Sequence, residues 1–145
     1  MSRSKAPNSL RFQPAGGERN TMPVGKKQML SIERLSHDGR GIAFLAGRTW
    51  FVSGALPGEQ VQAQVLAARS KVVEAQTLVV HNASAQRITP ECQWAGQCGG
   101  CTLQHISHAQ QIEFKHANLI EQLSREALVA DEWAQPLVGP AFAYR

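Results

Sequence analysis

The 145-residue sequence contains no apolar run that approaches the roughly 18 residues of a membrane-spanning helix. No apolar segment follows the basic N-terminus, so we expect no secretory signal. Only three cysteines occur, an odd number in a tight cluster, which favours a metal or cluster site over a disulfide framework. These absences exclude a membrane protein and argue against a disulfide-stapled toxin. The length suffices for one domain or two very small ones.

Acidic residues are scarce at the N-terminus, where the positive charge of the chain is concentrated. Residues 1–27 carry six Lys or Arg and one Glu, whereas residues 28–82 have a net charge of +1 and residues 83–145 of −2. The first segment is rich in Ser, Pro and Gly and lacks periodicity, so we predict a disordered basic arm. Such an arm is either a contact for a polyanion or a solvated tail, and charge alone does not distinguish RNA from DNA.

The sequence pattern of residues 28–82 predicts short strands separated by turns. Asp38-Gly39 offers the positive φ that a tight turn needs, and residues 60–65 alternate glutamine with valine or alanine. Five short strands close most economically into a small barrel, because closure removes exposed edges. We therefore predict a five-stranded, antiparallel, OB-like β-barrel. The expected strands are residues 29–35, 41–45, 49–52, 60–65 and 72–80, the last with Val73, Ala75, Thr77 and Val79 on one face.

The chain changes character after the barrel. Residues 83–106 contain all three cysteines and no periodic run, so a Cys-rich loop is expected. Residues 107–128 predict an amphipathic helix, with Ser107 as its N-cap and Gln110 completing a capping box. Barrel and helix together make the fold class α+β. Residues 107–145 are interpreted as this helix and the start of a following domain that is cut short.

The cysteines have the spacing Cys92-x5-Cys98-x2-Cys101. A Cys-x2-Cys pair can direct two thiolates at one metal, because a tight turn brings both sulfurs inward. Gly99 and Gly100 occupy the two positions between them, which permits unusual dihedral angles and lets backbone N–H groups approach the sulfurs. The spacing therefore predicts a metal or cluster site held by these three thiols.

Three thiolates are one short of a closed four-ligand site, and three completions are open. A fourth cysteine beyond Arg145 would give a four-cysteine iron–sulfur cluster or a zinc site. His105 would instead give a zinc site with three cysteines and one histidine, through the spacing Cys101-x3-His105. A substrate or another small molecule is the third possible occupant of the open position.

Two parts of the sequence resemble a known family. Residues 92–105 have the pattern Cys-x5-Cys-Gly-Gly-Cys-x2-Gln-His, which resembles the cluster-binding segment of the bacterial 23S rRNA (uracil-C5)-methyltransferases. The preceding barrel resembles the TRAM domain that such enzymes carry at their N-terminus. The matching barrel motifs are Asp-Gly-Arg-Gly-Ile-Ala at 38–43, Trp-Phe-Val at 50–52 and Leu-Pro-Gly-Glu at 56–59.

The resemblance implies a cytoplasmic, RNA-binding enzyme with a [4Fe–4S] cluster. Cys92, Cys98 and Cys101 would be three of the four cluster ligands, and the fourth cysteine would come from a later domain. The S-adenosylmethionine domain, the nucleophilic cysteine and the general base also lie later in that family, so this chain alone is expected to be inactive. We expect a monomer that binds 23S rRNA and neither DNA nor a membrane. The alternative is a stand-alone RNA-binding module whose zinc is held by the three cysteines and His105.

Basic and aromatic residues of the barrel are candidates for the RNA contacts. Trp50 and Phe51 are possible stacking platforms for bases, although strand alternation should bury one of the two. His105 is interpreted as a structural partner, and His37, His81, His108 and His116 as surface or helix residues. The candidate phosphate contacts are Arg34, Arg40, Arg48, Arg69 and Lys71.

Overall fold

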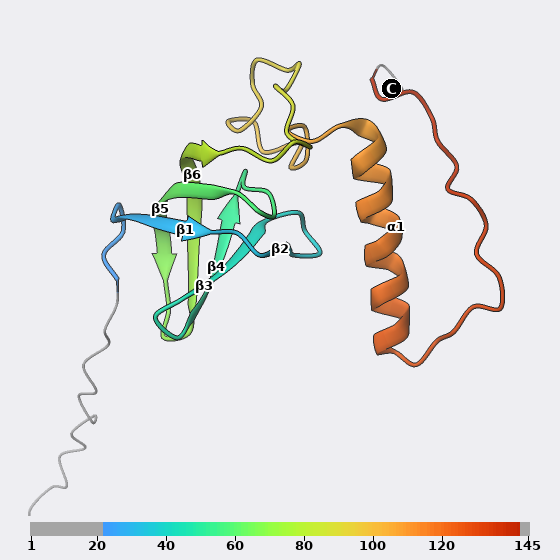
Figure 1. Cartoon of the computed structure of the whole chain (residues 1–145), viewed down its shortest axis with the longest axis horizontal. Coiled ribbons are helices and arrows are strands. Elements are labelled where there is room, and N and C mark those ends of the chain that lie inside the picture. Colours follow the sequence, from blue (N-terminus) through green and yellow to red (C-terminus); the bar gives the residue numbers. More distant parts are fainter. Residues whose placement is uncertain (1–21, 143–145) are drawn as a thin grey trace, which may run out of the picture.

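A computed structural model of the chain describes residues 22–142, and within them it shows one small β-barrel, a loop segment and one helix (Figure 1). No helix in this range has the length and apolarity to cross a membrane. The predicted arm of residues 1–27 falls mostly outside the described residues. The elements are β1 Lys27–Ser31, β2 Arg34–Leu35, β3 Gly41–Leu45, β4 Arg48–Ser53, β5 Gln60–Ala68, β6 Val72–Asn82 and α1 His108–Arg125.

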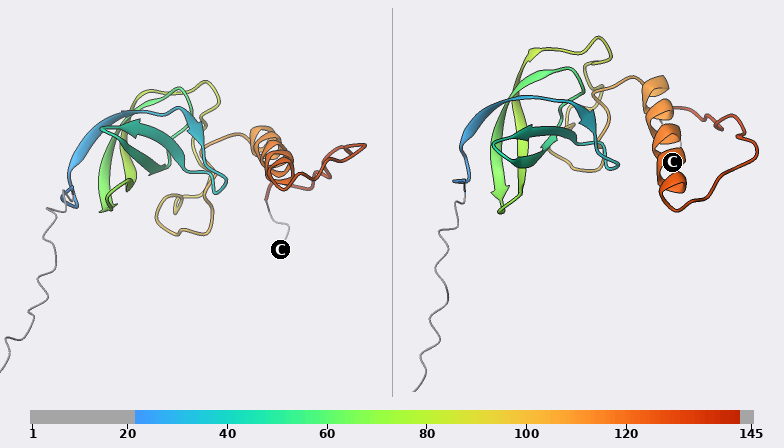
Figure 2. Two further views of the ribbon diagram at one scale, coloured as in Figure 1. Left: turned by 90° about the horizontal axis from the view of Figure 1, so that it is seen from below. Right: turned by 60° about the horizontal axis from the view of Figure 1, so that its bottom comes forward.

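The sheet has the order β1-β5-β6-β4-β3-β2, and its two outer strands are consecutive in the chain. Only Ile32 and Glu33 separate β1 from β2. The Ile32 N–H donates to the Glu59 carbonyl at 2.9 Å, and the Glu33 N–H donates to the Ile42 carbonyl at 2.8 Å. One interrupted strand therefore joins β5 to β3 and closes the barrel (Figure 2). The predicted OB-like barrel is confirmed, with the expected first strand divided in two.

The barrel is antiparallel, as predicted, except for one pair of strands: β4 and β6 are parallel. With β1 and β2 counted as one strand, five strands form the ring. Strand directions cannot alternate around a ring with an odd number of members, so one neighbouring pair must run parallel. The two strands that meet in this way are β4 and β6, each of which pairs antiparallel with its other neighbour.

Alternating side chains fill the barrel. Trp50 and Val52 of β4 point inward and are 0% exposed. On β5, the glutamines face outward while the residues between them are buried, as the sequence pattern predicts. On β6 the expected face holds only for Val73 and Ala75, because register shifts between β5 and β6 break the alternation and Val79 is exposed. The core residues are Leu30, Ile32, Ala43, Trp50, Val52, Ala55, Val61, Ala63, Val65, Val73 and Ala75.

The barrel begins earlier than the predicted boundary at residue 28. Lys27 already belongs to β1, and the Gly25 N–H donates to the Val65 carbonyl of β5 at 2.8 Å. Met22 packs against the barrel core. The last residues of the predicted basic arm are therefore part of the folded domain.

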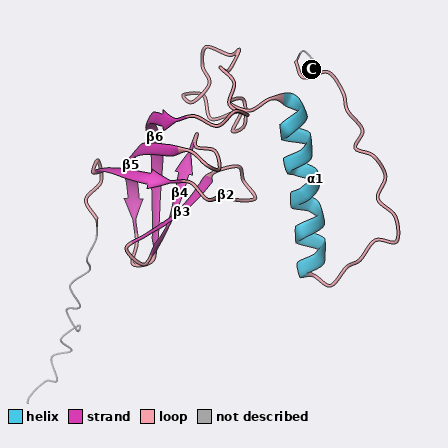
Figure 3. Ribbon diagram, viewed as in Figure 1, coloured by secondary structure: helices cyan, strands magenta, loops and turns pink. Residues whose placement is uncertain are grey.

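The helix α1 has the predicted start but ends three residues early. Ser107 is its N-cap, and the Ser107 hydroxyl accepts a hydrogen bond from the Gln110 N–H at 3.3 Å. The helix ends at Arg125, and Ala127 then adopts a left-handed φ of 55°. None of the helical residues is buried. The helix lies beside the barrel, and the following residues up to 142 form an extended loop (Figure 3).

A second, smaller apolar cluster attaches the Cys-rich segment to the barrel. Leu56 of the barrel packs with Leu103 and Ile106, which follow the cysteines. Leu35 and the helical residue Phe114 cover this cluster. The Asn118 side chain of α1 also donates to the His37 carbonyl at 3.0 Å, so the helix is fixed to the turn after β2.

A buried ion pair joins the same two regions. Glu59 is 0% exposed, and its carboxylate accepts hydrogen bonds from the Leu56 and Ser84 N–H groups at 2.8 and 3.0 Å. The Arg87 guanidinium binds both carboxylate oxygens at 2.6 and 2.7 Å and donates to the Gly54 carbonyl at 2.7 Å. Burial raises the pKa of Glu59, but hydrogen bonds from Arg87 and the two backbone groups outweigh it and lower the pKa below 4.5.

We predict that Glu59→Gln destabilises the fold by about 3 kcal/mol at pH 7, because it leaves Arg87 without its buried counter-charge. The pKa of Glu59 is lowered in the fold, so its contribution is complete above pH 4.5 and is lost as the pH falls through the lowered value. Urea unfolding at several pH values should therefore give a shallower acid dependence for the variant. Glu121→Gln, which removes an exposed ion pair with Arg125, should cost about 0.5 kcal/mol or less. Equal losses for the two variants would contradict the assigned role of Glu59.

We also predict that Gly39→Ala weakens the attachment of the Cys-rich segment. Gly39 has a φ of +85°, and a Cβ there would lie 2.6 Å from Leu103 Cδ2. The loss should be about 2–3 kcal/mol, from backbone strain together with the steric clash. Gly47 has a similar φ of +71° but open space around it, so Gly47→Ala should cost only about 1 kcal/mol. Chemical denaturation measures both, and a Gly39→Ala variant no weaker than Gly47→Ala would refute this contact.

Candidate functional site

The three cysteines lie on an exposed loop whose two ends are fixed. Cys92, Cys98 and Cys101 are all exposed and free. The Ile88 N–H donates to the His105 carbonyl at 2.9 Å, which closes the base of the loop next to the second apolar cluster. Within the loop, the Cys98 N–H donates to the Trp94 carbonyl at 3.0 Å. The loop is thus held by its base and by local turns rather than by a core of its own.

The three thiols fit a thiolate-bound metal in kind but are not gathered around one point. A Cβ on Gly100 would lie 3.4 Å from Cys98 Sγ, so glycine lets this sulfur pack close to the backbone. Gly99 has a φ of +70°, as expected for the turn between the two cysteines. Within residues 22–142 no group of three or more His, Cys, Asp or Glu side chains is arranged to hold a metal ion.

His105 lies against the barrel rather than among the thiols. It is 8% exposed, and its Nε2 atom has no hydrogen-bond partner among the described residues. Burial is the main reason that its pKa is lowered from 6.5. The nearby Arg87 charge adds to this effect and Glu59 opposes it. His105 is therefore neutral at pH 7.

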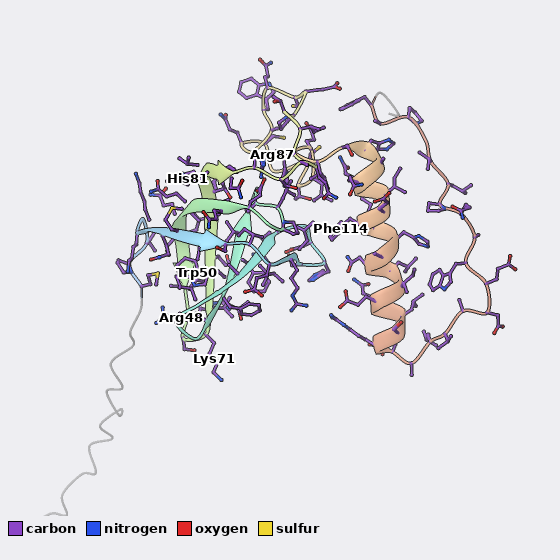
Figure 4. The ribbon with its side chains drawn as sticks, viewed as in Figure 1. Arg48, Trp50, Lys71, His81, Arg87 and Phe114 are labelled. Carbon is purple, nitrogen blue, oxygen red and sulfur yellow. The ribbon has the colours of Figure 1, made fainter. Side chains whose placement is uncertain are left out.

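The five candidate phosphate contacts lie at two ends of the barrel, three at one end and two, Arg34 and Arg40, at the other. Arg48 and Lys71 lie at the end of the barrel remote from the Cys-rich segment (Figure 4), where the Thr49 N–H donates to the Lys71 carbonyl at 2.9 Å. Arg69 lies in the same β5–β6 turn as Lys71. Arg34 pairs with Ile42 near the other end of β3. We call Arg48, Arg69 and Lys71 the basic end of the barrel.

Arg40 forms a fixed stack with two neighbours. Its guanidinium lies over the Phe51 ring, 4.7 Å from the ring centre, and binds the Asp38 carboxylate at 2.8 Å. Ser36 also donates to Asp38. Burial raises the pKa of Asp38, but the bonds from Ser36 and from Arg40, together with the Arg40 charge, lower it overall. Arg40 is thus held in one orientation, and its charge is partly neutralised by Asp38.

The prediction that Trp50 stacks on RNA bases is wrong, because Trp50 is fully buried in the barrel core. The alternation along β4 places Phe51 on the outer face instead, half-buried under Arg40. The sequence carried a signal for this choice: Trp50 alternates with the apolar Val52, whereas Phe51 alternates with Thr49 and Ser53. The remaining four histidines are exposed or half-buried, and His116 meets the Trp133 ring edge-on at 5.8 Å.

A pocket of about 370 Å³ lies between the barrel and the Cys-rich segment. The barrel side contributes Arg40, Ser53 and Gln76. The Cys-rich segment contributes Cys101 and His105, together with Gln104 and several glycines. Sequence reasoning did not find this pocket, because it forms only where two segments remote in the chain meet.

Comparison with known proteins places these features in context. Residues 23–78 match the TRAM domain. The whole chain is 57% identical over 147 aligned residues to the 23S rRNA (uracil(1939)-C(5))-methyltransferase RlmD of Pseudomonas aeruginosa strain UCBPP-PA14, and covers 32% of it. It is 58% identical over 147 residues to the protein of the same name from Pseudomonas entomophila, again covering 32%. The chain thus spans about a third of the length of these relatives.

The solved structures that match include the Pyrococcus abyssi tRNA (uracil-54, C5)-methyltransferase in complex with S-adenosyl-L-homocysteine. The match covers 66% of this chain and 21% of the other, with 28% identity and a TM-score of 0.47.

Proposed function

Residues 23–78 form a TRAM domain and the chain is similar to the N-terminal third of 23S rRNA (uracil-C5)-methyltransferases, and from this premise we propose that it is the RNA-binding part of such an enzyme. The observation that carries the proposal is the 57% identity over the full chain. In this proposal, S-adenosylmethionine and the reacting uracil bind to parts of the enzyme outside residues 1–145. The enzyme would act on 23S rRNA in the cytoplasm as a monomer.

Methyl transfer to a ring carbon requires the target base to leave its stack, at a cost of a few kcal/mol. A separate domain that grips the RNA nearby offsets part of this cost. The basic end suits this role, because Arg48 at the start of β4 and Arg69 and Lys71 in the β5–β6 turn bring three cations to one end of the barrel. Cations in such a position contact phosphates and fix the register of the RNA without reading its sequence.

The proposal extends to a [4Fe–4S] cluster held by Cys92, Cys98 and Cys101, with a fourth ligand from outside this chain. Its support is the chemistry of the donor set: three exposed thiols within ten residues, and a glycine turn that lets backbone groups approach sulfur. The loop has no apolar core of its own, so a bound cluster would stabilise it by cross-linking the three cysteines. Methyl transfer from S-adenosylmethionine to uracil needs no electron, so we assign the cluster a structural role.

We predict that Lys71→Gln weakens binding to a 23S rRNA fragment. The negative slope of log Kobs against log salt should become shallower by about 1, as loss of one phosphate contact requires. Lys115→Gln removes the same charge from α1, which is not part of the basic end, and should leave the slope unchanged. Fluorescence anisotropy at several salt concentrations measures both. Equal slopes for the two variants would place the phosphate contacts elsewhere.

We predict that anaerobic reconstitution with iron and sulfide turns the chain brown, with the broad visible absorption of thiolate-bound clusters. Cys98→Ser and Cys101→Ser should each abolish the colour, whereas His105→Ala should retain it because His105 lies against the barrel. A colourless protein with stoichiometric zinc that is lost in His105→Ala would instead support the zinc-module alternative.

A further inference from the structure

We propose that the pocket between the barrel and the Cys-rich segment receives one unpaired RNA base, stacked on the Arg40 guanidinium. This inference rests on the proposed RNA-binding function and assigns it a second, base-contacting site. The site differs from the basic end, which contacts only phosphates in that proposal. Three features of the described residues support it: a preformed stacking surface, unpartnered polar atoms on residues of the pocket lining, and the absence of carboxylates from that lining.

The stacking surface is the Asp38–Arg40–Phe51 stack. Arg40 lines the pocket and its guanidinium also lies over the Phe51 ring, 4.7 Å from the ring centre, so one side chain connects the ring with the pocket. Asp38 holds the plane through bonds of 2.8 Å to both Nε and Nη2 of Arg40. RNA-binding proteins stack unpaired bases on aromatic rings and on arginine planes, and a guanidinium already fixed in position loses little entropy when a base lies on it.

Two residues of the pocket lining carry polar atoms that lack partners. His105 Nε2 and Gln104 Oε1 are buried and have no hydrogen-bond partner among the described residues, and both residues line the pocket. A buried polar atom without a partner is costly, so a rotation of either side chain that brings its free atom to a base in the pocket is favoured. Every nucleobase carries donors and acceptors on its edges, which suits an amide oxygen beside a neutral imidazole.

The charges around the pocket tolerate an RNA strand. Among the described residues, no aspartate or glutamate lines the pocket, and two arginines, Arg40 and Arg87, do. Each of these arginines is paired with one carboxylate, Asp38 and Glu59 respectively. The pocket volume of about 370 Å³ lies near the small end of the range for small-ligand sites, which suits one base rather than a duplex. The occupant is therefore an unpaired base of a single-stranded or looped RNA.

The test uses the full 145-residue chain, a uridine-containing single-stranded RNA hexanucleotide and an abasic hexanucleotide with the same phosphates. In amide NMR spectra, the RNA should shift the signals of Gly54, Gly96 and Gln104, which line the pocket. Arg40→Lys keeps the charge but removes the planar group, so it should weaken binding of the hexanucleotide about tenfold. Arg125→Lys, the same substitution in the exposed end of α1, should have no effect.

The abasic hexanucleotide separates stacking from charge without any change to the protein. It should bind the wild-type chain about tenfold more weakly than the normal RNA, and Arg40→Lys should cause no further loss with it. If the shifts are confined to the basic end and Arg40→Lys binds as tightly as wild type, this inference is overturned while the proposed function stands. If neither RNA binds at all, the proposed function fails and the inference with it.

Discussion

The buried ion pair between Glu59 and Arg87 is the interaction on which the arrangement of this protein depends. A carboxylate with no exposure to water is tolerated only because it accepts four hydrogen bonds. Two come from the Arg87 guanidinium, one to each oxygen, and two come from backbone N–H groups. The partners come from two different regions, the loop after β4 and the start of the Cys-rich segment. The pair therefore fixes where the cysteine loop leaves the barrel, and it shapes the pocket between them.

Closure of the barrel explains why the basic residues divide as they do. A five-membered ring of strands needs one parallel pair, and here β4 and β6 both begin at the same end of the barrel. Arg48 is the first residue of β4 and Lys71 directly precedes β6, so both cations lie at that end. Arg40 directly precedes β3, which runs antiparallel to β4. Arg40 therefore lies at the opposite end of the barrel, beside the Cys-rich segment. Topology thus places Arg40 at the opposite end of the barrel from Arg48 and Lys71.

Local patterns predicted most of the elements, and long-range contacts account for what they missed. The glutamine alternation in β5, the Ser107 cap and the turn at Gly39 are encoded within a few residues, and the structure confirms them. The helix end was misplaced because Ala127 takes the left-handed position that glycine usually signals. The Glu59–Arg87 pair joins residues 28 positions apart, and no periodicity marks such a contact.

The pocket escaped prediction for the same reason, since its walls come from segments that meet only in the folded chain. The candidate site was recognised through its cysteine spacing and its similarity to a family. The choice between Trp50 and Phe51 could have been made from strand alternation alone, because their neighbours differ in polarity.

The interrupted β1–β2 strand has a consequence for how the chain folds as it is synthesised. β1 leaves the ribosome before the other strands, yet its partner β5 is made only after three further strands, β2 to β4. The pairs Leu30–Val61 and Trp50–Val73 bring together residues far apart in sequence, and such topology slows folding compared with helical proteins. The barrel cannot close until β6 has emerged, so the apolar face of β1 needs protection from aggregation during that interval.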